Sequence, residues 1–379
     1  MLSPSTHAWA PGETLGQHLE HRGIDRRDFL AFCRNMAIVL GAGETLAPTI
    51  AHALEVQKRP TVIWLELQEC TGCVESITRS GEPDIGTLVL DLISLDSSDT
   101  LMAAAGAAAE KARLDSMRAN KGKYLLIVTG SVPLAEDGIY TMIAGRTARE
   151  HLEEAARDAA AVIAVGACAH FGSVQAARPN PTQAVGVRDI VKDKPVLVIA
   201  GCPPVPDVIT ASVVHFLTFG SLPKADAQGR PLFAYGARIH DQCPRRSNFD
   251  AGQFVQHFDD EGARQGWCLY EVGCKGPQTF SPCPVFQWNL KTSWPIGAGH
   301  PCIGCTEAHF WDTMTPFYQR LPDIAGAGVE RTIDRIGVTL AGLTVAGVAA
   351  HAAYTTVRRA GRGKELPVVP PGGPSTGGQ

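Results

Sequence analysis

Short, continuous apolar runs recur along the chain from Pro60 to about Gly220. The runs are Thr61 to Leu67, Tyr124 to Val128, Ala161 to Val165 and Val196 to Ala200, and helix-like stretches at Leu101 to Met117 and Thr147 to Ala159 lie between them. Continuous Val, Ile and Leu strands that alternate with helices are typical of a parallel sheet covered on both faces. The pattern predicts a doubly wound α/β domain at residues 54–221, and ligands of such sheets bind beyond the carboxyl ends of the strands.

The strand rhythm stops between about Leu222 and Asp323. Gly, Pro, Trp and Cys become frequent there, and long connections without periodic hydrophobicity follow one another. Such a segment needs another source of stability, and bound metal can supply it because metal binding is coupled to folding. We therefore expect a second, irregular domain at residues 222–330.

An apolar stretch near the C-terminal end is long enough to cross a membrane. Ile336 to Val357 holds 22 residues without Asp, Glu, Lys or Arg, and at about 1.5 Å per residue it spans a hydrocarbon core of about 30 Å. Four basic residues follow it, at positions 358, 359, 362 and 364, and the positive-inside rule places them in the cytoplasm. We predict one transmembrane helix at 336–357 and a cytoplasmic, basic and disordered tail at 358–379. A buried Ala/Gly-rich core helix is the alternative.

The N-terminal segment has the order of elements of a twin-arginine export signal. The sequence DRRDFL at 25–30 precedes a mildly apolar run at 36–43 and then the triplet Ala51-His52-Ala53. This order predicts a signal peptide at residues 1–53, cleaved after Ala53, which would carry Cys33 away with it. With the C-terminal anchor, it predicts a body on the periplasmic side of the inner membrane. An arginine pair on a surface helix is the alternative.

Cysteine is the exceptional component of an otherwise ordinary globular composition. The chain has 379 residues, 45% hydrophobic and 19% charged, with a net charge of -4, which argues against nucleic acid as the main partner. Its 11 cysteines are too few for a disulfide miniprotein and many for an enzyme core. Metal or redox chemistry is therefore the leading hypothesis.

Four cysteines follow the predicted strands of the α/β half: Cys70, Cys73, Cys168 and Cys202. A single cysteine at a strand end is usually a small buried hydrophobe, but four at equivalent places are better explained by a shared site. Four thiolates suit a cubane iron-sulfur cluster or a structural zinc. Glycines beside them, at 72, 166, 172 and 201, suit close backbone approach to a bulky inorganic group.

Seven further candidate ligands crowd the irregular half, and their spacing suggests two unequal sites. One site takes His240, Cys243, Cys268 and Cys274, and the other takes Cys283, Cys302 and Cys305. Three thiolates suit a [3Fe-4S] cluster. Zinc and disulfides are the competitors, although a twin-arginine route carries folded cargo and is most useful when a cofactor is assembled before export.

Several motifs resemble the small subunit of membrane-bound nickel-iron uptake hydrogenases. They are ECTGCVE at 69–75, GACA at 166–169, VQAA at 174–177, GCPP at 201–204 and WPIGAGHPCIGCTE at 294–307. The resemblance implies a flavodoxin-like N-terminal domain with a proximal [4Fe-4S] cluster on Cys70, Cys73, Cys168 and Cys202. It also implies a distal [4Fe-4S] cluster on His240, Cys243, Cys268 and Cys274, and a medial [3Fe-4S] cluster on Cys283, Cys302 and Cys305. Pro295 would stand where a fourth medial ligand could lie.

The resemblance further implies the partners and the reaction. No cysteines remain for a nickel-iron centre, so dihydrogen would be split in a partner large subunit, and this chain would relay electrons to a membrane cytochrome b and then to quinone. Glu69 and Thr71 could assist proton exit, or Glu69 could simply be solvated. Oxygen-tolerant relatives carry two extra cysteines where this chain has Gly72 and Ser173, so we expect an ordinary four-cysteine proximal cluster.

Two alternatives belong to other classes. One is a membrane-anchored iron-sulfur electron-transfer module that has no hydrogenase partner. The other is a quinone-reductase subunit that shares the proximal-cluster domain, but this hypothesis leaves the seven later ligands unexplained.

Overall fold

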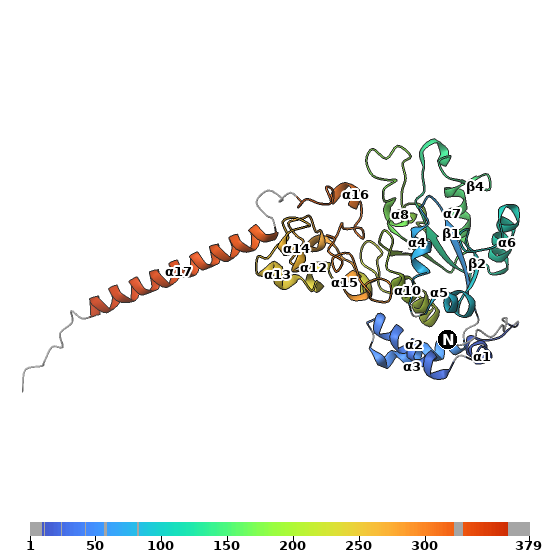
Figure 1. Ribbon diagram of the computed structural model, residues 1–379, viewed down its shortest axis with the longest axis horizontal. Coiled ribbons are helices and arrows are strands. Elements are labelled where there is room, and N and C mark those ends of the chain that lie inside the picture. The colour runs from blue at the N-terminus through green and yellow to red at the C-terminus, as the bar shows by residue number, and fades with distance from the viewer. Residues whose placement is uncertain are drawn as a thin grey trace, which may run out of the picture. The chain divides into compact units, whose positions relative to one another are not determined.

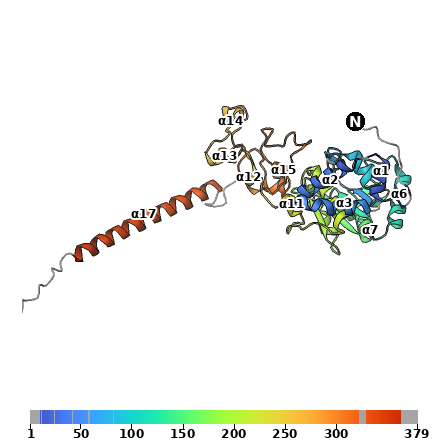
Figure 2. The same ribbon diagram turned by 90° about the horizontal axis from the view of Figure 1, so that it is seen from below.

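The computed structural model describes residues 10, 12–23, 25–41, 43–56, 59–81, 83–321 and 329–362 (Figures 1 and 2). Its contacts divide the chain into two units, of which the first ends at Leu321. The second unit contains the long helix α17 (Val329–Arg362). Each unit is described by itself.

A five-stranded parallel sheet forms the centre of the first unit. Its strands are β1 (Thr61–Glu66), β2 (Ser94–Ser97), β3 (Leu125–Thr129), β6 (Ala161–Val165) and β7 (Val196–Ile199). They lie in the order β2-β1-β3-β6-β7, and every pairing is parallel. Every residue of β3 and β6 is buried, as expected for a sheet covered on both faces. The predicted doubly wound α/β architecture is confirmed, with one of the two common strand orders of that class.

Helices on the flanks of the sheet connect its strands, and a last one follows the final strand. They are α4 (Gly72–Ile77), α5 (Ile85–Thr87), α6 (Gly106–Ala119), α7 (Ala148–Arg157), α8 (Ala167–Phe171), α9 (Val187–Ile190) and α10 (Pro206–Phe219), with the turns η2 (Leu88–Leu92) and η3 (Ala135–Gly138) and a small hairpin of β4 (Met142–Ile143) and β5 (Arg146–Thr147). α6 packs on β1 and β2, while α8 packs on β3, β6 and β7. Helix α7 begins where the Thr147 side chain accepts a hydrogen bond from the backbone N–H of Glu150, which is a capping box.

Two details of the predicted elements are wrong. Strand β2 was not predicted, because it is a short edge strand whose sequence SLDS is largely polar. The helix expected from Leu101 begins only at Gly106. The reason is tertiary: the Glu66 carboxylate accepts hydrogen bonds from the Ser98 hydroxyl (2.6 Å) and the Thr100 backbone N–H (3.1 Å), which hold this segment as a turn.

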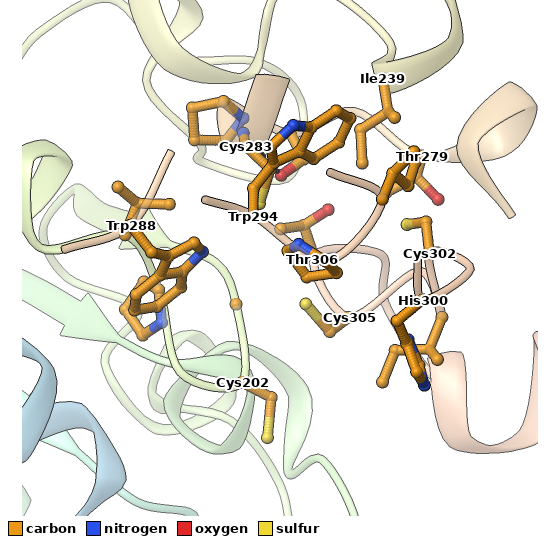
Figure 3. A pocket seen from close by; sticks show the side chains of 18 of the residues that line it. Cys202, Ile239, Thr279, Cys283, Trp288, Trp294, His300, Cys302, Cys305 and Thr306 are labelled. Atoms are coloured by element: carbon orange, nitrogen blue, oxygen red, sulfur yellow. Dashed lines mark hydrogen bonds between the residues drawn. The ribbon is translucent and has the colours of Figure 1, made fainter. Parts of the chain in front are cut away.

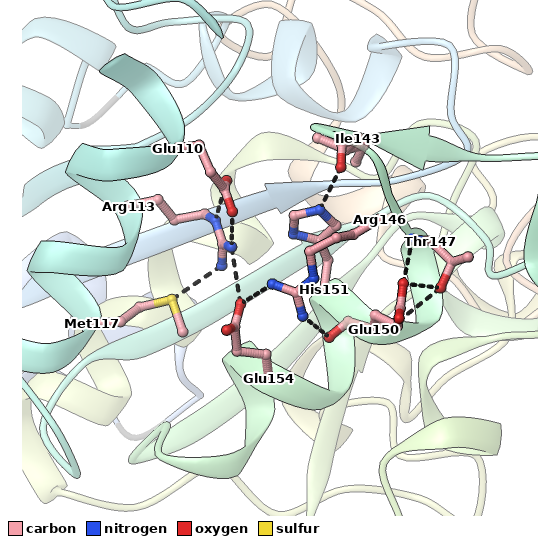
Figure 4. A network of polar contacts seen from close by, with 9 residues as sticks. All are labelled: Glu110, Arg113, Met117, Ile143, Arg146, Thr147, Glu150, His151 and Glu154. Atoms are coloured by element: carbon pink, nitrogen blue, oxygen red, sulfur yellow. Dashed lines mark hydrogen bonds and ion pairs between the residues drawn. The ribbon is translucent and has the colours of Figure 1, made fainter. Parts of the chain in front are cut away.

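A partly buried ion-pair network connects α6 to α7 (Figure 4). The Arg113 guanidinium donates to Glu110 at 2.6 Å and to Glu154 at 3.0 Å, and Arg146 donates to Glu154 at 2.9 Å. One ligand-type atom each of Glu110, Glu154 and His151 lie within 4.8 Å of one another. Two guanidinium groups already neutralise the two carboxylates, so we interpret the cluster as an ion-pair network and not as a metal site.

The N-terminal helices pack against the same core as the sheet. They are α1 (Leu15–His21), α2 (Arg26–Val39) and α3 (Ala47–Val56), with the short turn η1 (Glu44–Leu46) before α3. Phe29, Met36 and Leu54 are buried in the core cluster that includes the strands, and α3 contacts α10. In η2, the Asp91 carboxylate lies 3.1 Å from His18 Nε2 and 3.2 Å from Arg22 Nε, which ties α1 to the body.

The cysteine-rich half consists of short elements joined by loops. They are α11 (Leu232–Tyr235), α12 (Ile239–Gln242), α13 (Arg246–Asp250), α14 (Glu261–Arg264), η4 (Gly276–Gln278), α15 (Cys283–Phe286) and α16 (Phe310–Thr313). A small apolar cluster around Val255, Leu269 and Trp294 forms its own core. The irregular character agrees with the absence of periodic hydrophobicity in this segment.

Helix α17 contains the stretch Gly337–Ala360. Among the described residues, it is the one helical segment long and apolar enough to cross a bilayer, and its side chains are not buried against other parts of the protein. It overlaps the predicted span of 336–357. The disordered tail was predicted at 358–379, but α17 continues to Arg362, so residues 358–362 are helical, and the rest of the predicted tail lies outside the described residues.

Candidate metal centres

Four cysteines of the α/β half gather at the carboxyl edge of the sheet, and we call them the proximal set. They follow β1, β6 and β7: Cys70, Cys73, Cys168 and Cys202. Burial raises the pKa of Cys73 well above its usual value, and charges on Glu69, Cys168, Cys202 and Cys70 raise it further. Because such charges act over short distances, the four sulfurs are neighbours although they are far apart in the sequence.

Glycines leave room around these sulfurs. Gly166 has φ +95°, and a Cβ atom there would lie 2.3 Å from Cys73 Sγ. At Gly72 a Cβ atom would lie 3.3 Å from Cys70 Sγ. Any side chain at position 166 would therefore displace a sulfur and strain the backbone.

Polar groups surround the proximal set. The Cys168 thiol lies 3.4 Å from Gln175 Oε1, and Gln175 Nε2 donates to the Gln68 carbonyl at 3.1 Å. Thr71 has φ +64° and its hydroxyl donates to the Cys70 carbonyl at 2.6 Å. Burial raises the pKa of Glu69 to about 7, and its carboxylate oxygens are buried. The alternative of a simply solvated Glu69 is therefore wrong.

His240, Cys243, Cys268 and Cys274 form a second group, the distal set. All four line one small cavity of about 20 Å³, so the structure brings these four side chains to one site. Burial raises the pKa of Cys268 to about 12, and charges on Cys274 and Cys243 add to this effect. Burial lowers the pKa of His240, which favours the neutral imidazole that binds metals.

Cys283, Cys302 and Cys305 form a third group, the medial set. They line a cavity of about 500 Å³ together with Cys202 and Pro295 (Figure 3). One water molecule takes about 30 Å³ of liquid, so this cavity has room for a polyatomic inorganic group. Pro295, the position at which the resemblance implies a missing fourth ligand, lines the same cavity as the three cysteines.

The three sets adjoin one another in a fixed order. Burial raises the pKa of Cys305 to about 12, and charges on Cys283 and, from the proximal set, Cys202 also raise it. Burial raises the pKa of Cys302 well above its usual value, and the largest neighbouring charge is that of Cys274 in the distal set. The order is therefore proximal, medial, distal.

The donor chemistry fits metal ions better than it fits disulfides. All eleven cysteines lie within the described residues and are free. Burial raises the pKa of most of the sulfurs in the three sets. Grouped thiols that resist ionisation become thiolates when a metal supplies the compensating charge, because the thiolate is the ligand form.

Sequence reasoning overlooked Lys275, which directly follows Cys274. Only 1% of Lys275 is exposed, although lysine is almost never fully buried unless it is paired. Its position directly after a predicted ligand is the sequence feature that could have drawn attention to Lys275.

Models of two protein families match the chain. The model for the C-terminal part of the NiFe/NiFeSe hydrogenase small subunit matches residues 235–318. The model for the 20 Kd subunit of NADH ubiquinone oxidoreductase matches residues 70–216. The two matches cover all three sets.

Whole-chain relatives are similar over almost their full length. An "Uptake hydrogenase small subunit" of Azotobacter vinelandii is 52% identical over 92% of this chain and 97% of its own. A "Hydrogenase-1 small chain" of Escherichia coli (strain K12) is 47% identical over 94% of this chain and 95% of its own. Among solved structures, a [NiFeSe]-hydrogenase chain of Dm. baculatum superposes with a TM-score of 0.66 at 32% identity, over 70% of this chain and 100% of that one. A [NiFeSe] hydrogenase chain of Desulfovibrio vulgaris Hildenborough gives a TM-score of 0.63 at 35% identity, over 69% and 98%.

Proposed function

The chain belongs to the family of nickel-iron uptake hydrogenase small subunits, and from this premise we propose how its three ligand sets serve electron transfer. Members of this family carry iron-sulfur clusters and form a heterodimer with a hydrogenase large subunit. The chain is accordingly the electron-transfer subunit of a hydrogenase. What remains to be assigned is which residues hold which cluster.

Each set has a proposed occupant. The proximal set would hold a [4Fe-4S] cluster within a flavodoxin-like domain at 54–221. The distal set would hold a second [4Fe-4S] cluster, and the medial set a [3Fe-4S] cluster, within the irregular domain at 222–330. When bound, these clusters would take up and release single electrons. With Gly72 and Ser173 at the positions of extra cysteines, the proximal cluster would be an ordinary four-cysteine one.

The observation that carries this assignment is the continuous order of the three sets. Cys202 lines the same cavity as Cys305 at the proximal-medial boundary. At the medial-distal boundary, the Cys302 carbonyl accepts a hydrogen bond of 2.8 Å from the backbone N–H of Lys275, the residue after Cys274. The protein's own part is to hold the sulfurs in the core, to exclude water from them and to supply nearby amides. The neutral imidazole of His240 would make the distal set less negative than four thiolates.

Metal analysis of the purified heterodimer tests the assignment. We expect roughly eleven irons and a similar amount of acid-labile sulfide per heterodimer from these clusters, with nickel present only when the large subunit is bound. Zinc in place of iron, or sulfurs paired as disulfides, would contradict the assignment. Hydrogen-dependent dye reduction by the same preparation separates it from an electron-transfer module without a hydrogenase partner.

Two further proposals concern protons and the electron acceptor. Glu69 and Thr71 flank Cys70, and Cys70 and Thr71 are exposed, so this segment would offer a proton path toward the large subunit.

The membrane acceptor would be a cytochrome b that reduces quinone, with α17 as the anchor and its basic C-terminal end in the cytoplasm. Isolation of the complex with a haem b protein from detergent-solubilised membranes would support this acceptor.

We also propose that residues 1–53 are a twin-arginine signal that sends the folded protein to the periplasmic side. Arg26 and Arg27 are exposed on α2, while Ala51 is buried within α3. Cleavage after Ala53 would therefore require α3 to open first.

Changing Arg26 and Arg27 to Lys should leave the protein in the cytoplasm, uncleaved. The exchange should not unfold the chain, because the exposed Arg26–Glu55 pair at 3.4 Å is of a kind worth about 0–1 kcal/mol. Fractionation and immunoblotting of precursor and mature forms measure the result. Arg34→Lys, at an exposed position of the same helix, is the control, and normal export of the double variant would contradict the targeting role.

A further inference from the structure

Lys275 lies at the junction of the medial and distal sets. Its backbone N–H donates to the Cys302 carbonyl at 2.8 Å, and it follows Cys274 directly. Lys275 is therefore joined to one distal ligand through the chain and to one medial ligand through a backbone hydrogen bond.

The Lys275 side chain reaches three backbone carbonyls of a single loop. Nζ donates to the carbonyls of Pro316 at 3.1 Å, Phe317 at 3.5 Å, and Gln319. An ammonium group has three N–H donors, and a neutral amine has only two. The arrangement therefore matches the charged form, and no carboxylate pairs with Lys275 among the ion pairs of the described residues.

Other contacts hold the same loop independently of Lys275. A Cβ atom at Gly273 would lie 2.4 Å from the Phe317 carbonyl oxygen, so loop and backbone pack closely there. Arg320 donates to Glu271 at 2.9 Å and stacks over the Tyr270 ring at 4.6 Å. Arg320 is also a cation, but it is paired with Glu271, whereas Lys275 contributes a positive charge that no carboxylate offsets among the ion pairs of the described residues.

We propose that Lys275 is a positioning residue for electron flow: it is a fixed positive charge that raises the reduction potentials of the medial and distal clusters. Reduction adds negative charge to a cluster, and a nearby buried cation stabilises that charge. The inference rests on the proposed cluster assignment. It predicts a role for the charge of Lys275 beyond holding the loop.

The experiment is a redox titration of the intact heterodimer followed by EPR. Lys275→Met and Lys275→Gln should lower the midpoint potentials of the medial and distal signals. In Lys275→Arg, these two potentials should stay close to those of the unsubstituted protein. If the role of Lys275 were purely structural, Lys275→Gln should have the same midpoint potentials as Lys275→Arg, because a glutamine can still donate to the loop carbonyls. The proximal cluster is the internal reference, and its potential should not move.

A control comes from a second, partly buried lysine that also donates to three backbone carbonyls. Lys194 Nζ donates to the carbonyls of Ala156 at 2.6 Å, Arg157 at 3.1 Å and Ala159 at 3.2 Å, at the end of α7 and outside all three sets. Lys194→Met should leave all potentials unchanged.

Two outcomes would overturn the inference. One is unchanged medial and distal potentials in the Met and Gln variants with their clusters intact. The other is loss of both clusters in the Gln variant, which would make Lys275 structural only. Absence of these clusters from the parent would instead refute the proposed function.

Discussion

Replacing Cys283 with Ala should abolish the EPR signal of the [3Fe-4S] cluster while the proximal signal survives. Cys283 supplies one of three medial sulfurs, and Pro295 in the same cavity has no side-chain donor atom to replace it. Burial raises the pKa of Cys283, so its thiolate depends on bound metal for compensating charge. EPR of the oxidised heterodimer measures the result, and the expected loss is complete.

Cys33→Ala is the matched control, measured on the uncleaved precursor, because cleavage after Ala53 would remove Cys33 from the mature chain. Cys33 is fully buried in α2, and burial raises its pKa to about 12, but it belongs to none of the three sets. Its loss should leave every cluster signal in place. Persistence of the [3Fe-4S] signal in Cys283→Ala would refute the medial grouping, and loss of all signals would mean that the sets do not assemble independently.

The sheet could be predicted because its buried strands are continuously apolar. The predicted bounds of β6 are those observed, β1 and β7 each end one residue earlier than predicted, and β3 is shifted by one residue at both ends. The edge strand β2 carries no such pattern, because only one of its edges pairs with another strand and its sequence is largely polar. The start of α6 depends on Glu66, which is distant in sequence, and no local signal reports that contact.

The three groups of candidate ligands could be predicted from where the cysteines stand in the sequence. Cysteines after parallel strands must converge at one edge of the sheet, and the structure brings them together there. In the irregular half, only the spacing and a family resemblance pointed to two groups of candidate ligands, and the residues of each group line one cavity in the structure. Lys275 and the packing of α1–α3 on the body depend on long-range contacts and could not be predicted from patterns.

His240→Ala should slow electron delivery to external acceptors far more than hydrogen-deuterium exchange at the large subunit. The exchange reaction needs no electron to leave the complex, whereas acceptor reduction needs the distal set. Removing the imidazole leaves one metal position without its ligand, and we expect a loss of about tenfold or more, ~1.4 kcal/mol in activation free energy. Assays of both reactions on the same preparation measure the ratio.

The chain offers a matched control in His215. Its ring packs on Phe219 with centroids 4.7 Å apart, as His240 packs on Phe249 at 4.6 Å, and burial lowers the pKa of both. His215→Ala should therefore reproduce the loss of packing without the loss of a ligand, and both activities should persist.

His240→Cys should restore a ligand while making the distal set more negative, so its cluster should return at a lower potential. Equal loss of exchange and acceptor reduction in His240→Ala would count against a distal role, because a residue at the exit of the electron path cannot limit a reaction that keeps its electrons at the large subunit.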